Sequence, residues 1–220
     1  MGKTRLGKIK LTKMQVALIL GGIYIFLQMV ADIAASKIIH VGFLVMDAGI
    51  IYSFTFTWRD LVHKQLGKKA AQTLIILAGV INVLMVLYFQ FVIFLPPEAE
   101  WLAAGGQSAW LLVFGIVPRI VVASIIAELI SELIDTEVYQ WWTSGFGKGK
   151  AQYWRVFTSN AISIPIDSAL FTAIAFAGIL SPGILFIMFL SNIFIKVVIT
   201  LLSFWMIYLV PEKPLYSSED

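Results

Sequence analysis

Six long stretches of the chain are dominated by apolar residues, and shorter polar or charged segments separate them. The stretches cover roughly residues 14–35, 43–58, 70–95, 109–133, 159–180 and 183–210. A helix of about 20 predominantly apolar residues crosses a hydrocarbon core of ~30 Å. The pattern therefore predicts an all-α integral membrane protein, in which residues 1–220 form a single domain of six transmembrane helices.

The stretch over 43–58 is the shortest of the six and is rich in β-branched and aromatic residues. Such residues favour strands. Strands that cross a membrane, however, require a closed barrel of at least about eight members. The remaining pattern supplies no such set of strands. We therefore predict a helix over 43–58, because a helix satisfies its backbone groups internally.

Composition agrees with a membrane protein. Hydrophobic residues make up 60% of the chain and charged residues 13%, against about 45–50% and 25% in soluble domains. The chain has no cysteine, which excludes disulfides, thiolate nucleophiles and zinc–thiolate sites. Its net charge of +3 does not indicate a nucleic-acid partner, because membrane proteins collect Lys and Arg in their cytoplasmic loops.

The basic residues predict an orientation. On one side of the membrane the arrangement places thirteen of them, namely Lys3, Arg5, Lys8, Lys10, Lys13, Arg59, Lys64, Lys68, Lys69, Lys148, Lys150, Arg155 and Lys213. The opposite side receives only Lys37. Because positive loops stay inside, both termini are expected in the cytoplasm of a multi-pass inner-membrane protein. The first apolar stretch is too long for a signal-peptide core, so we expect it to be retained.

Several polar residues fall deep within the predicted spans. Counted at 1.5 Å per residue, Arg119, Asp167 and Lys196 lie near the bilayer midplane, and Asn82 is similarly deep. A charge at that depth costs about 2.5–3.5 kcal/mol on insertion scales. We expect these residues to face inward and to neutralise one another or line a wet cavity. An ion pair that only locks helices together remains the alternative.

The fourth stretch carries an acidic stripe. Glu128, Glu132 and Asp135 follow one another at i, i+4 and i+7, so they share one face of a helix. Two interpretations stay open: carboxylates that contact a solute, or an interfacial face that pairs with neighbouring basic residues. Asp60, Asp135 and Arg155 are expected at the cytoplasmic surface, as a gate or as structural charges.

Enzyme signatures are absent from the sequence. It contains no His-Glu-x-x-His and no Gly-x-Ser-x-Gly motif, and the segment at 145–150, GFGKGK, lacks the spacing of a phosphate loop. We therefore expect no catalytic residue, no metal site and no cofactor. Any coupling to ATP would need a partner protein.

Polar motifs along the chain resemble those of a known family. They are DIAASK at 32–37, DLVHKQLG at 60–67, the set of Arg119, Ser124, Ser131 and Asp135, the segment WRVFTSNAISIPIDSALF at 154–171, and Lys196. In this order and spacing they are similar to the queuosine precursor transporters, also called the vitamin uptake transporter family, over nearly the whole chain. Four positions depart from the pattern: Asp32 stands where asparagine is usual, Ser53 where proline is common, Lys64 where glutamate is common and Glu132 where glutamine is common.

The resemblance implies a six-helix fold similar to the substrate-binding subunits of energy-coupling-factor importers. It also implies import of 7-deazaguanine precursors of queuosine, the 7-cyano or the 7-aminomethyl base. A small-molecule base and the lipid bilayer are the expected partners. A homodimer and an ATP-driven partner stay open, as does an intramembrane enzyme or scaffold.

A guanine-like edge presents an N–H and an NH₂ side by side, which suits a carboxylate that accepts two hydrogen bonds. We predict Asp167 in this role, with Glu128 or Glu132 second, and Arg119 or Lys196 as donor to the ring carbonyl. Aromatic side chains, Phe171 or Tyr52, would stack on the planar ring. Ser124 and Asn82 complete the predicted site, although Asn82 equally suits a hydrogen bond between helices.

Overall fold

The computed structural model describes residues 4–6, 9–144 and 152–203. Within them the chain forms helices and two antiparallel hairpins. In chain order the elements are β1 (Thr4–Leu6), β2 (Ile9–Leu11), α1 (Lys13–Ala34), β3 (Ile38–Val41), β4 (Leu44–Asp47), the 3-10 helix η1 (Gly49–Tyr52), α2 (Ser53–Leu66), α3 (Lys68–Phe94), α4 (Ala99–Ala103), α5 (Gly106–Phe114), α6 (Val117–Ser144), α7 (Gln152–Phe176) and α8 (Pro182–Ser203).

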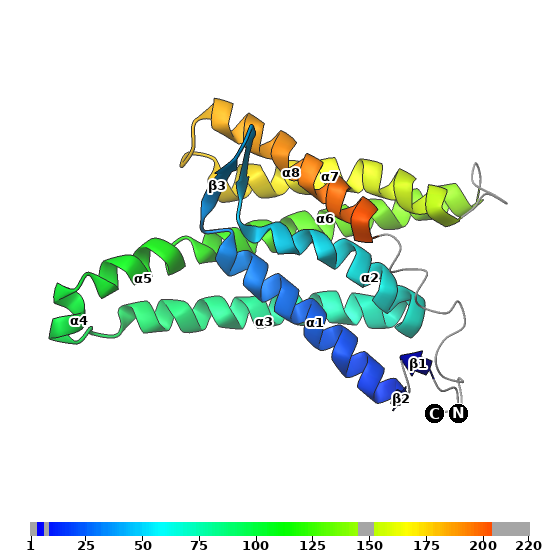
Figure 1. The fold of residues 1–220 in the computed structure, drawn as a ribbon, viewed down its shortest axis with the longest axis horizontal. Helices are drawn as coiled ribbons and strands as arrows, with labels where there is room; N and C mark the ends of the chain where they lie inside the picture. Colours follow the sequence, from blue (N-terminus) through cyan, green and yellow to red (C-terminus); the bar gives the residue numbers. More distant parts are fainter. Residues whose placement is uncertain (1–3, 7–8, 145–151, 204–220) are drawn as a thin grey trace.

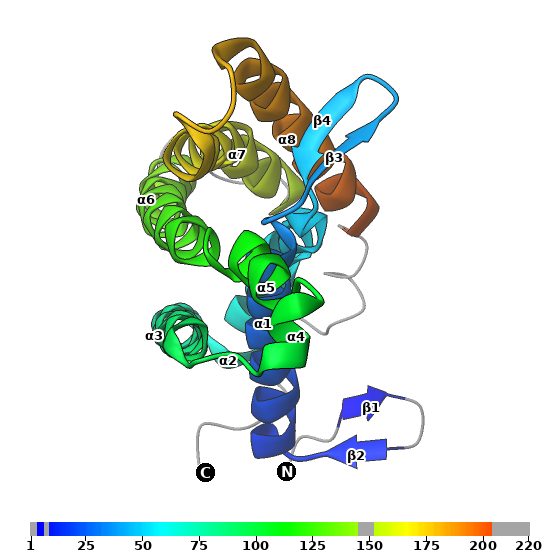
Figure 2. The ribbon, with the colours of Figure 1, turned by 90° about the vertical axis from the view of Figure 1, so that its left-hand side faces the viewer.

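The long helices run lengthwise through an elongated bundle, with α1 crossing it diagonally (Figure 1). The start of α1, the junction of α2 and α3, and the start of α7 lie at one end of the bundle, whereas α4 and α5 form the other end. Figure 2 shows α6 and α7 packed side by side. This arrangement places at one end three of the segments that the sequence assigns to the cytoplasm.

Four segments are long and apolar enough to cross a membrane, namely Lys13–Ala34, Lys69–Phe94, Gly106–Ser131 and Pro182–Ser203. α7 contains a shorter apolar segment, Asn160–Phe176. α1 and α3 occupy the stretches predicted over 14–35 and 70–95, and α7 covers the one over 159–180 as far as Phe176. The stretch over 109–133 is shared by α5 and α6, with a break at residues 115–116. α8 covers most of the stretch over 183–210, whose last residues lie outside the described part. That six helices cross the membrane stays a prediction.

The prediction of one helix over 43–58 is wrong. Residues 38–47 form the β3–β4 hairpin, in which Ile38 pairs with Asp47 and Val41 with Leu44, and η1 and the start of α2 follow it. The turn uses Gly42, whose φ of 63° suits glycine. The β-branched residues of this segment therefore take the strand conformation that they favour.

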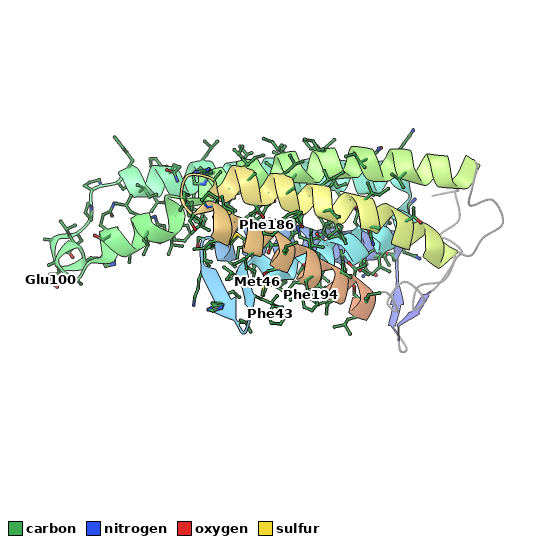
Figure 3. All side chains as sticks on the ribbon, turned by 90° about the horizontal axis from the view of Figure 1, so that it is seen from above. Phe43, Met46, Glu100, Phe186 and Phe194 are labelled. Atoms are coloured by element: carbon green, nitrogen blue, oxygen red, sulfur yellow. The ribbon has the colours of Figure 1, made fainter. Side chains whose placement is uncertain are left out.

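The hairpin lies against α8 instead of standing alone. The backbone N–H of Val45 donates to Ser191 Oγ at 3.1 Å, and the rings of Phe43 and Phe194 have centroids 6.4 Å apart. Figure 3 shows these two rings close together at the edge of the bundle. α8 covers β4, in which Met46 and Asp47 are buried, whereas residues 40–43 around the turn are exposed. Protein therefore covers the hairpin along one strand only.

Apolar side chains cover the outside of the bundle. Along α3, for example, Ile76, Val80, Leu84, Leu87 and Phe91 are all exposed. The interior holds smaller apolar clusters, one of which joins Ile120 and Ala123 of α6 to Phe176 of α7 and Met188 of α8. Many buried residues are polar. An apolar exterior around a partly polar interior is the arrangement expected in lipid.

Candidate functional site

A hollow with about 490 Å³ of empty space opens between α1, the hairpin, η1, α6, α7 and α8. Its lining consists of Ala31, Asp32, Ala35, Asp47, Gly49, Ile50, Tyr52, Ser53, Ser124, Ala127, Asp167, Phe171, Asn192, Ile195 and Lys196. Small-molecule sites are commonly concave and mostly apolar, with a few converging polar groups. This hollow fits that description and is the candidate site.

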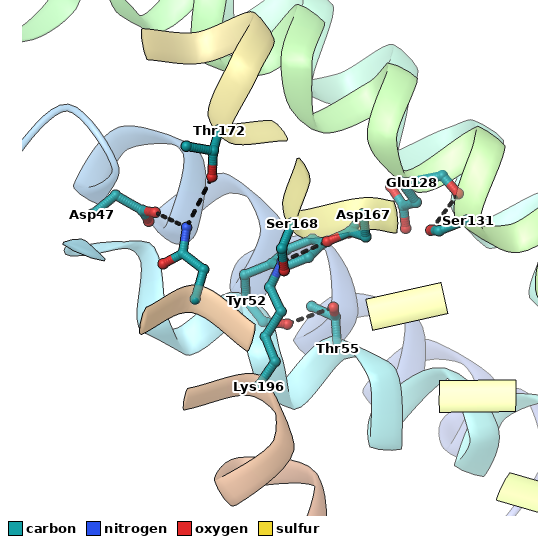
Figure 4. Close-up of polar contacts among 10 residues, drawn as sticks. Asp47, Tyr52, Thr55, Glu128, Ser131, Asp167, Ser168, Thr172 and Lys196 are labelled. Atoms are coloured by element: carbon teal, nitrogen blue, oxygen red, sulfur yellow. Dashed lines mark hydrogen bonds and ion pairs between the residues drawn. The ribbon is translucent and has the colours of Figure 1, made fainter. Parts of the chain in front are cut away.

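A buried ion pair forms one wall. Lys196 Nζ lies 2.5 Å from Asp167 Oδ2 and 3.2 Å from Ser168 Oγ, to which it donates a hydrogen bond (Figure 4). The ammonium also lies 5.5 Å from the centre of the Tyr52 ring, a distance that permits a cation–π interaction. The pair joins α7 to α8, which explains how two charges are accommodated at this depth.

One oxygen of that pair has no partner. Asp167 is 1% exposed, and its Oδ1 is buried without a hydrogen bond. A buried acceptor left unsatisfied costs on the order of 1–3 kcal/mol, and native proteins rarely carry one without a reason. Because Asp167 lines the hollow, this oxygen is suited to accept a hydrogen bond from a solute.

Asp47 forms a second polar group on the hairpin side. Its Oδ2 accepts from Asn192 Nδ2 at 3.2 Å, and the same amide lies 3.4 Å from Thr172 Oγ1. Burial raises the pKa of the Asp47 carboxyl, while the Lys196 ammonium and the Asn192 amide oppose that rise. Asp47 is thus a buried carboxyl group with Lys196 as an electrostatic neighbour.

Asp32 lines the same hollow from α1. It is 3% exposed, and its Oδ2 accepts from Asn82 Nδ2 of α3 at 2.9 Å. The Asn82 amide also lies 3.5 Å from Gln28 Oε1. The Asn82 side chain therefore supports the hollow from behind, as an interhelical hydrogen bond, without lining it.

Gly49 allows η1 to approach α1. A Cβ at this position would lie 2.8 Å from the Ala31 carbonyl oxygen and 2.8 Å from Asp47 Oδ1. Both distances are too short for a real contact, so no larger residue fits without a shift of the backbone. The backbone N–H of Gly49 also donates to Asp47 Oδ1 at 3.0 Å. This one glycine therefore fixes the position of Asp47 beside α1.

A separate polar cluster lies behind the hollow around Glu128 of α6, which is 4% exposed. The hydroxyl of Tyr24 donates to Glu128 Oε1, and Gln28 Nε2 lies 2.8 and 2.9 Å from the two carboxylate oxygens. Figure 4 places Glu128 beyond Asp167, away from Asp47. Glu128 thus links α1 to α6 and does not line the hollow.

The structure brings together four of the predicted binding residues, because Asp167, Lys196, Ser124 and Phe171 line the hollow. Asn82 lies one hydrogen bond behind the hollow, through Asp32, and Glu128 lies further back, through Gln28 and Asn82. The side chains of Glu132, Asp60, Asp135 and Arg155 lie outside the part of the chain that the structure describes. Within that part, no group of three or more His, Cys, Asp or Glu residues is placed to hold a metal ion.

Arg119 is not part of the hollow, contrary to the prediction that it shares a pocket with Asp167 and Lys196. It is exposed, its Nε donates to the Ile174 carbonyl at 2.7 Å, and its Nη2 donates to the Ala177 carbonyl at 2.5 Å. Carbonyls at the end of a helix lack intrahelical donors. The guanidinium therefore caps α7, which satisfies its charge without a carboxylate.

Neither Asp47 nor Asp32 was selected for the site from the sequence. The signal for Asp47 was an acidic residue at the end of an apolar run and two residues before Gly49. That signal was hidden by the interpretation of the segment as a helix. Asn192 also lines the hollow, although it was not among the residues selected from the sequence.

Two comparisons with known proteins bear on this site. A family model described as "Putative vitamin uptake transporter" matches residues 47–210, more than half of the chain. The "Probable queuosine precursor transporter" of Bacillus subtilis (strain 168) is 25% identical over 154 residues, which cover 70% of this chain and 66% of that relative. The match thus spans just under two thirds of the relative's length. No solved structure matches the chain.

Proposed function

The chain belongs to the vitamin uptake transporter family, and from this premise we propose that it imports 7-deazaguanine precursors of queuosine, the 7-cyano or the 7-aminomethyl base. The chain is a multi-pass membrane protein of the cell membrane. The named substrate of the Bacillus relative and the chemistry of the hollow support this choice of solute. The hollow is proposed as the binding site.

The observation that carries the proposal is the unpartnered Oδ1 of Asp167. A guanine-like base offers two adjacent donors, the ring N–H and the exocyclic NH₂. A carboxylate is an acceptor at both oxygens and makes strong, directional bonds to such a pair. Asp167 Oδ1 would accept one donor, and Oδ2 would accept the other beside Lys196. The Lys196 ammonium, which has three donors, would then reach the ring carbonyl.

The apolar part of the lining suits a planar base. Phe171 and Tyr52 both line the hollow, and aromatic side chains bind flat rings by stacking or by edge contacts. The empty space of about 490 Å³ includes volume that is open to solvent. The choice of a planar base therefore rests on the aromatic and polar side chains of the lining and not on the size of the hollow.

A second function uses the same hollow. The chain would be the substrate-binding membrane subunit for a purine-like or vitamin solute and would require an ATP-driven partner, as the energy-coupling-factor importers do. The sequence favours this alternative in one respect, because it contains no phosphate-binding loop of its own. In that case the purified chain binds the base but does not transport it alone.

Reconstitution separates the two functions. The purified chain is placed in liposomes, and uptake of radiolabelled 7-cyano- and 7-aminomethyl-7-deazaguanine is measured beside thermal stability with each base. A ligand that binds only the folded state raises its stability. Uptake by the chain alone supports the transporter. Stabilisation without uptake supports the subunit. If neither base stabilises the chain or is taken up, the proposal is wrong.

Two variants locate the site in the same experiment. Asp167→Asn keeps the shape of the side chain but turns an acceptor into a donor, so uptake should fall to background. Glu100→Gln removes a carboxylate from α4, far from the hollow, and should leave uptake unchanged. Wild-type uptake by Asp167→Asn would remove Asp167 from the proposed site.

A further inference from the structure

The hollow is lined by more carboxyl groups than cationic groups. Its acidic and basic lining residues, among those that the structure describes, are Asp32, Asp47 and Asp167 against the single ammonium of Lys196. Lys196 is already in an ion pair with Asp167. Asp32 and Asp47 accept hydrogen bonds from uncharged donors, the Asn82 amide for Asp32 and the Asn192 amide and Gly49 N–H for Asp47. The cation nearest to Asp47 is Lys196, which Asp167 already pairs.

Both of these carboxyl groups are removed from water, with exposed fractions of 3% for Asp32 and 8% for Asp47. A buried carboxylate without an opposite charge is costly, even when it is hydrogen-bonded. A positive charge on the ligand would balance it. The buried Oδ1 of Asp167, which has no hydrogen-bond partner among the described residues, is a second observation in favour of a ligand in this hollow.

Asp32 and Asp47 enter the hollow from two segments whose backbones approach each other closely. Gly49 lies between the two segments. A Cβ built on it would be 2.8 Å from Asp47 Oδ1 and 2.8 Å from the carbonyl oxygen of Ala31, which is the residue before Asp32. Asp32 and Asp47 also interact electrostatically. In Figure 4, Asp47 and Asp167 lie on either side of the Lys196 side chain. A ligand held by Asp167 and Lys196 would therefore extend toward Asp32 and Asp47.

The substituent at position 7 of a deazaguanine lies on the five-membered ring, away from the donor edge that Asp167 is proposed to bind. An aminomethyl substituent is a primary alkylammonium, like the end of a lysine side chain, whose pKa is about 10.4, so it is positively charged near neutral pH. A nitrile carries neither a charge nor a donor.

We propose that Asp32 and Asp47 form an ammonium-binding subsite, so that the chain selects the cationic 7-aminomethyl base over the neutral 7-cyano base. This inference rests on the proposed function and adds the substrate's charge to it. The carboxylates accept hydrogen bonds from the ammonium and neutralise it. The nitrile leaves the same carboxylates buried and unbalanced. Asp32 and Asp47 thereby act as specificity residues, separate from Asp167.

The test is calorimetric titration of the purified full chain with three bases: the 7-aminomethyl compound, the 7-cyano compound and the neutral 7-hydroxymethyl compound, which matches the first in size. The aminomethyl base should bind at least about tenfold more tightly than either neutral base, since charge-assisted bonds are roughly twice as strong as neutral ones. Asp32→Asn and Asp47→Asn should each weaken aminomethyl binding about tenfold and change binding of the neutral bases by less than about twofold.

Equal affinity of the wild-type chain for the three bases overturns the inference but leaves the proposed function in place. An equal loss for all three bases in both variants also overturns it, because it indicates a purely structural role. If no base binds, the inference fails together with the proposed function. The wild-type comparison among the three bases decides the matter even if a variant fails to fold.

Discussion

Lys196 Nζ on α8 and Asp167 Oδ2 on α7 lie 2.5 Å apart, and the two residues are 7% and 1% exposed. The ion pair bridges two helices at the wall of the hollow, so the same contact both joins the bundle and shapes the candidate site. Loss of one partner of a buried pair typically costs about 3–5 kcal/mol, because the remaining charge is left uncompensated.

A double-mutant cycle measures how strongly the pair is coupled. Asp167→Asn and Lys196→Met alone should each lower the free energy of unfolding by about 3–5 kcal/mol. The double variant should lose clearly less than the sum of the two, because neither charge is then left alone. Chemical unfolding of the four proteins in mixed micelles gives the values. Strictly additive losses would mean that the two side chains do not interact.

The deep charges of the sequence predicted much of this site. Asp167 and Lys196 were placed at similar depth by counting residues, and the cost of a charge in lipid required them to face inward. The structure brings them together with Ser124 and Phe171. The argument on buried charge holds for Asp167 and Lys196, which pair with each other. It failed for Arg119, because backbone carbonyls at the end of α7 satisfy that charge instead.

The hairpin could not be found in the same way. Hydropathy does not distinguish a short apolar helix from a buried strand, and the sequence over 43–58 was judged by rules for elements that face lipid. Those rules do not hold where protein covers the backbone, as α8 does here. The error also hid Asp47, because the geometry of Gly42 and Gly49 becomes visible only once the turn is known.

Gly49 should not tolerate a side chain. Gly49→Ala would place a methyl group 2.8 Å from the Ala31 carbonyl oxygen and from Asp47 Oδ1, so α1 and η1 must separate. We expect a loss of about 1–3 kcal/mol of stability, the usual cost of overpacking, and weaker binding of the base. Thermal unfolding with and without ligand measures both effects.

Gly22→Ala is the matched control for that substitution. Gly22 lies on α1, and a Cβ there would meet nothing within 4 Å. Alanine is favoured over glycine within a helix by about 1 kcal/mol, so this variant should be as stable as the parent or more so. If Gly49→Ala behaves like Gly22→Ala, the close approach of η1 to α1 is not required.

Labelling of single cysteines tests the predicted orientation. The parent chain has no cysteine, so each variant carries one target and the parent is the blank. Lys69→Cys lies at the start of α3 and Glu100→Cys on α4, at opposite ends of the bundle, and both positions are exposed. A membrane-impermeant maleimide added to intact cells should label Glu100→Cys and should label Lys69→Cys only after permeabilisation. The reverse pattern would contradict cytoplasmic termini.

Arg119 should stabilise the fold without contributing to binding. Arg119→Lys keeps the charge but loses the fork that donates to the carbonyls of Ile174 and Ala177. Because the site is exposed, we expect a loss of roughly 1 kcal/mol, at the low end for hydrogen bonds to a charged group. Affinity for the 7-deazaguanine bases should stay within about twofold, since Arg119 does not line the hollow.

Thermal unfolding and calorimetric titration of Arg119→Lys and Arg119→Met separate the two roles of this residue. A structural cap gives a graded loss of stability, larger for methionine, because a lysine can still donate to one carbonyl at the end of α7. A donor to the base would instead give lost affinity at unchanged stability. That second outcome would support the prediction from the sequence that Arg119 contacts the base. The end of α7 would then have to rearrange when the solute binds.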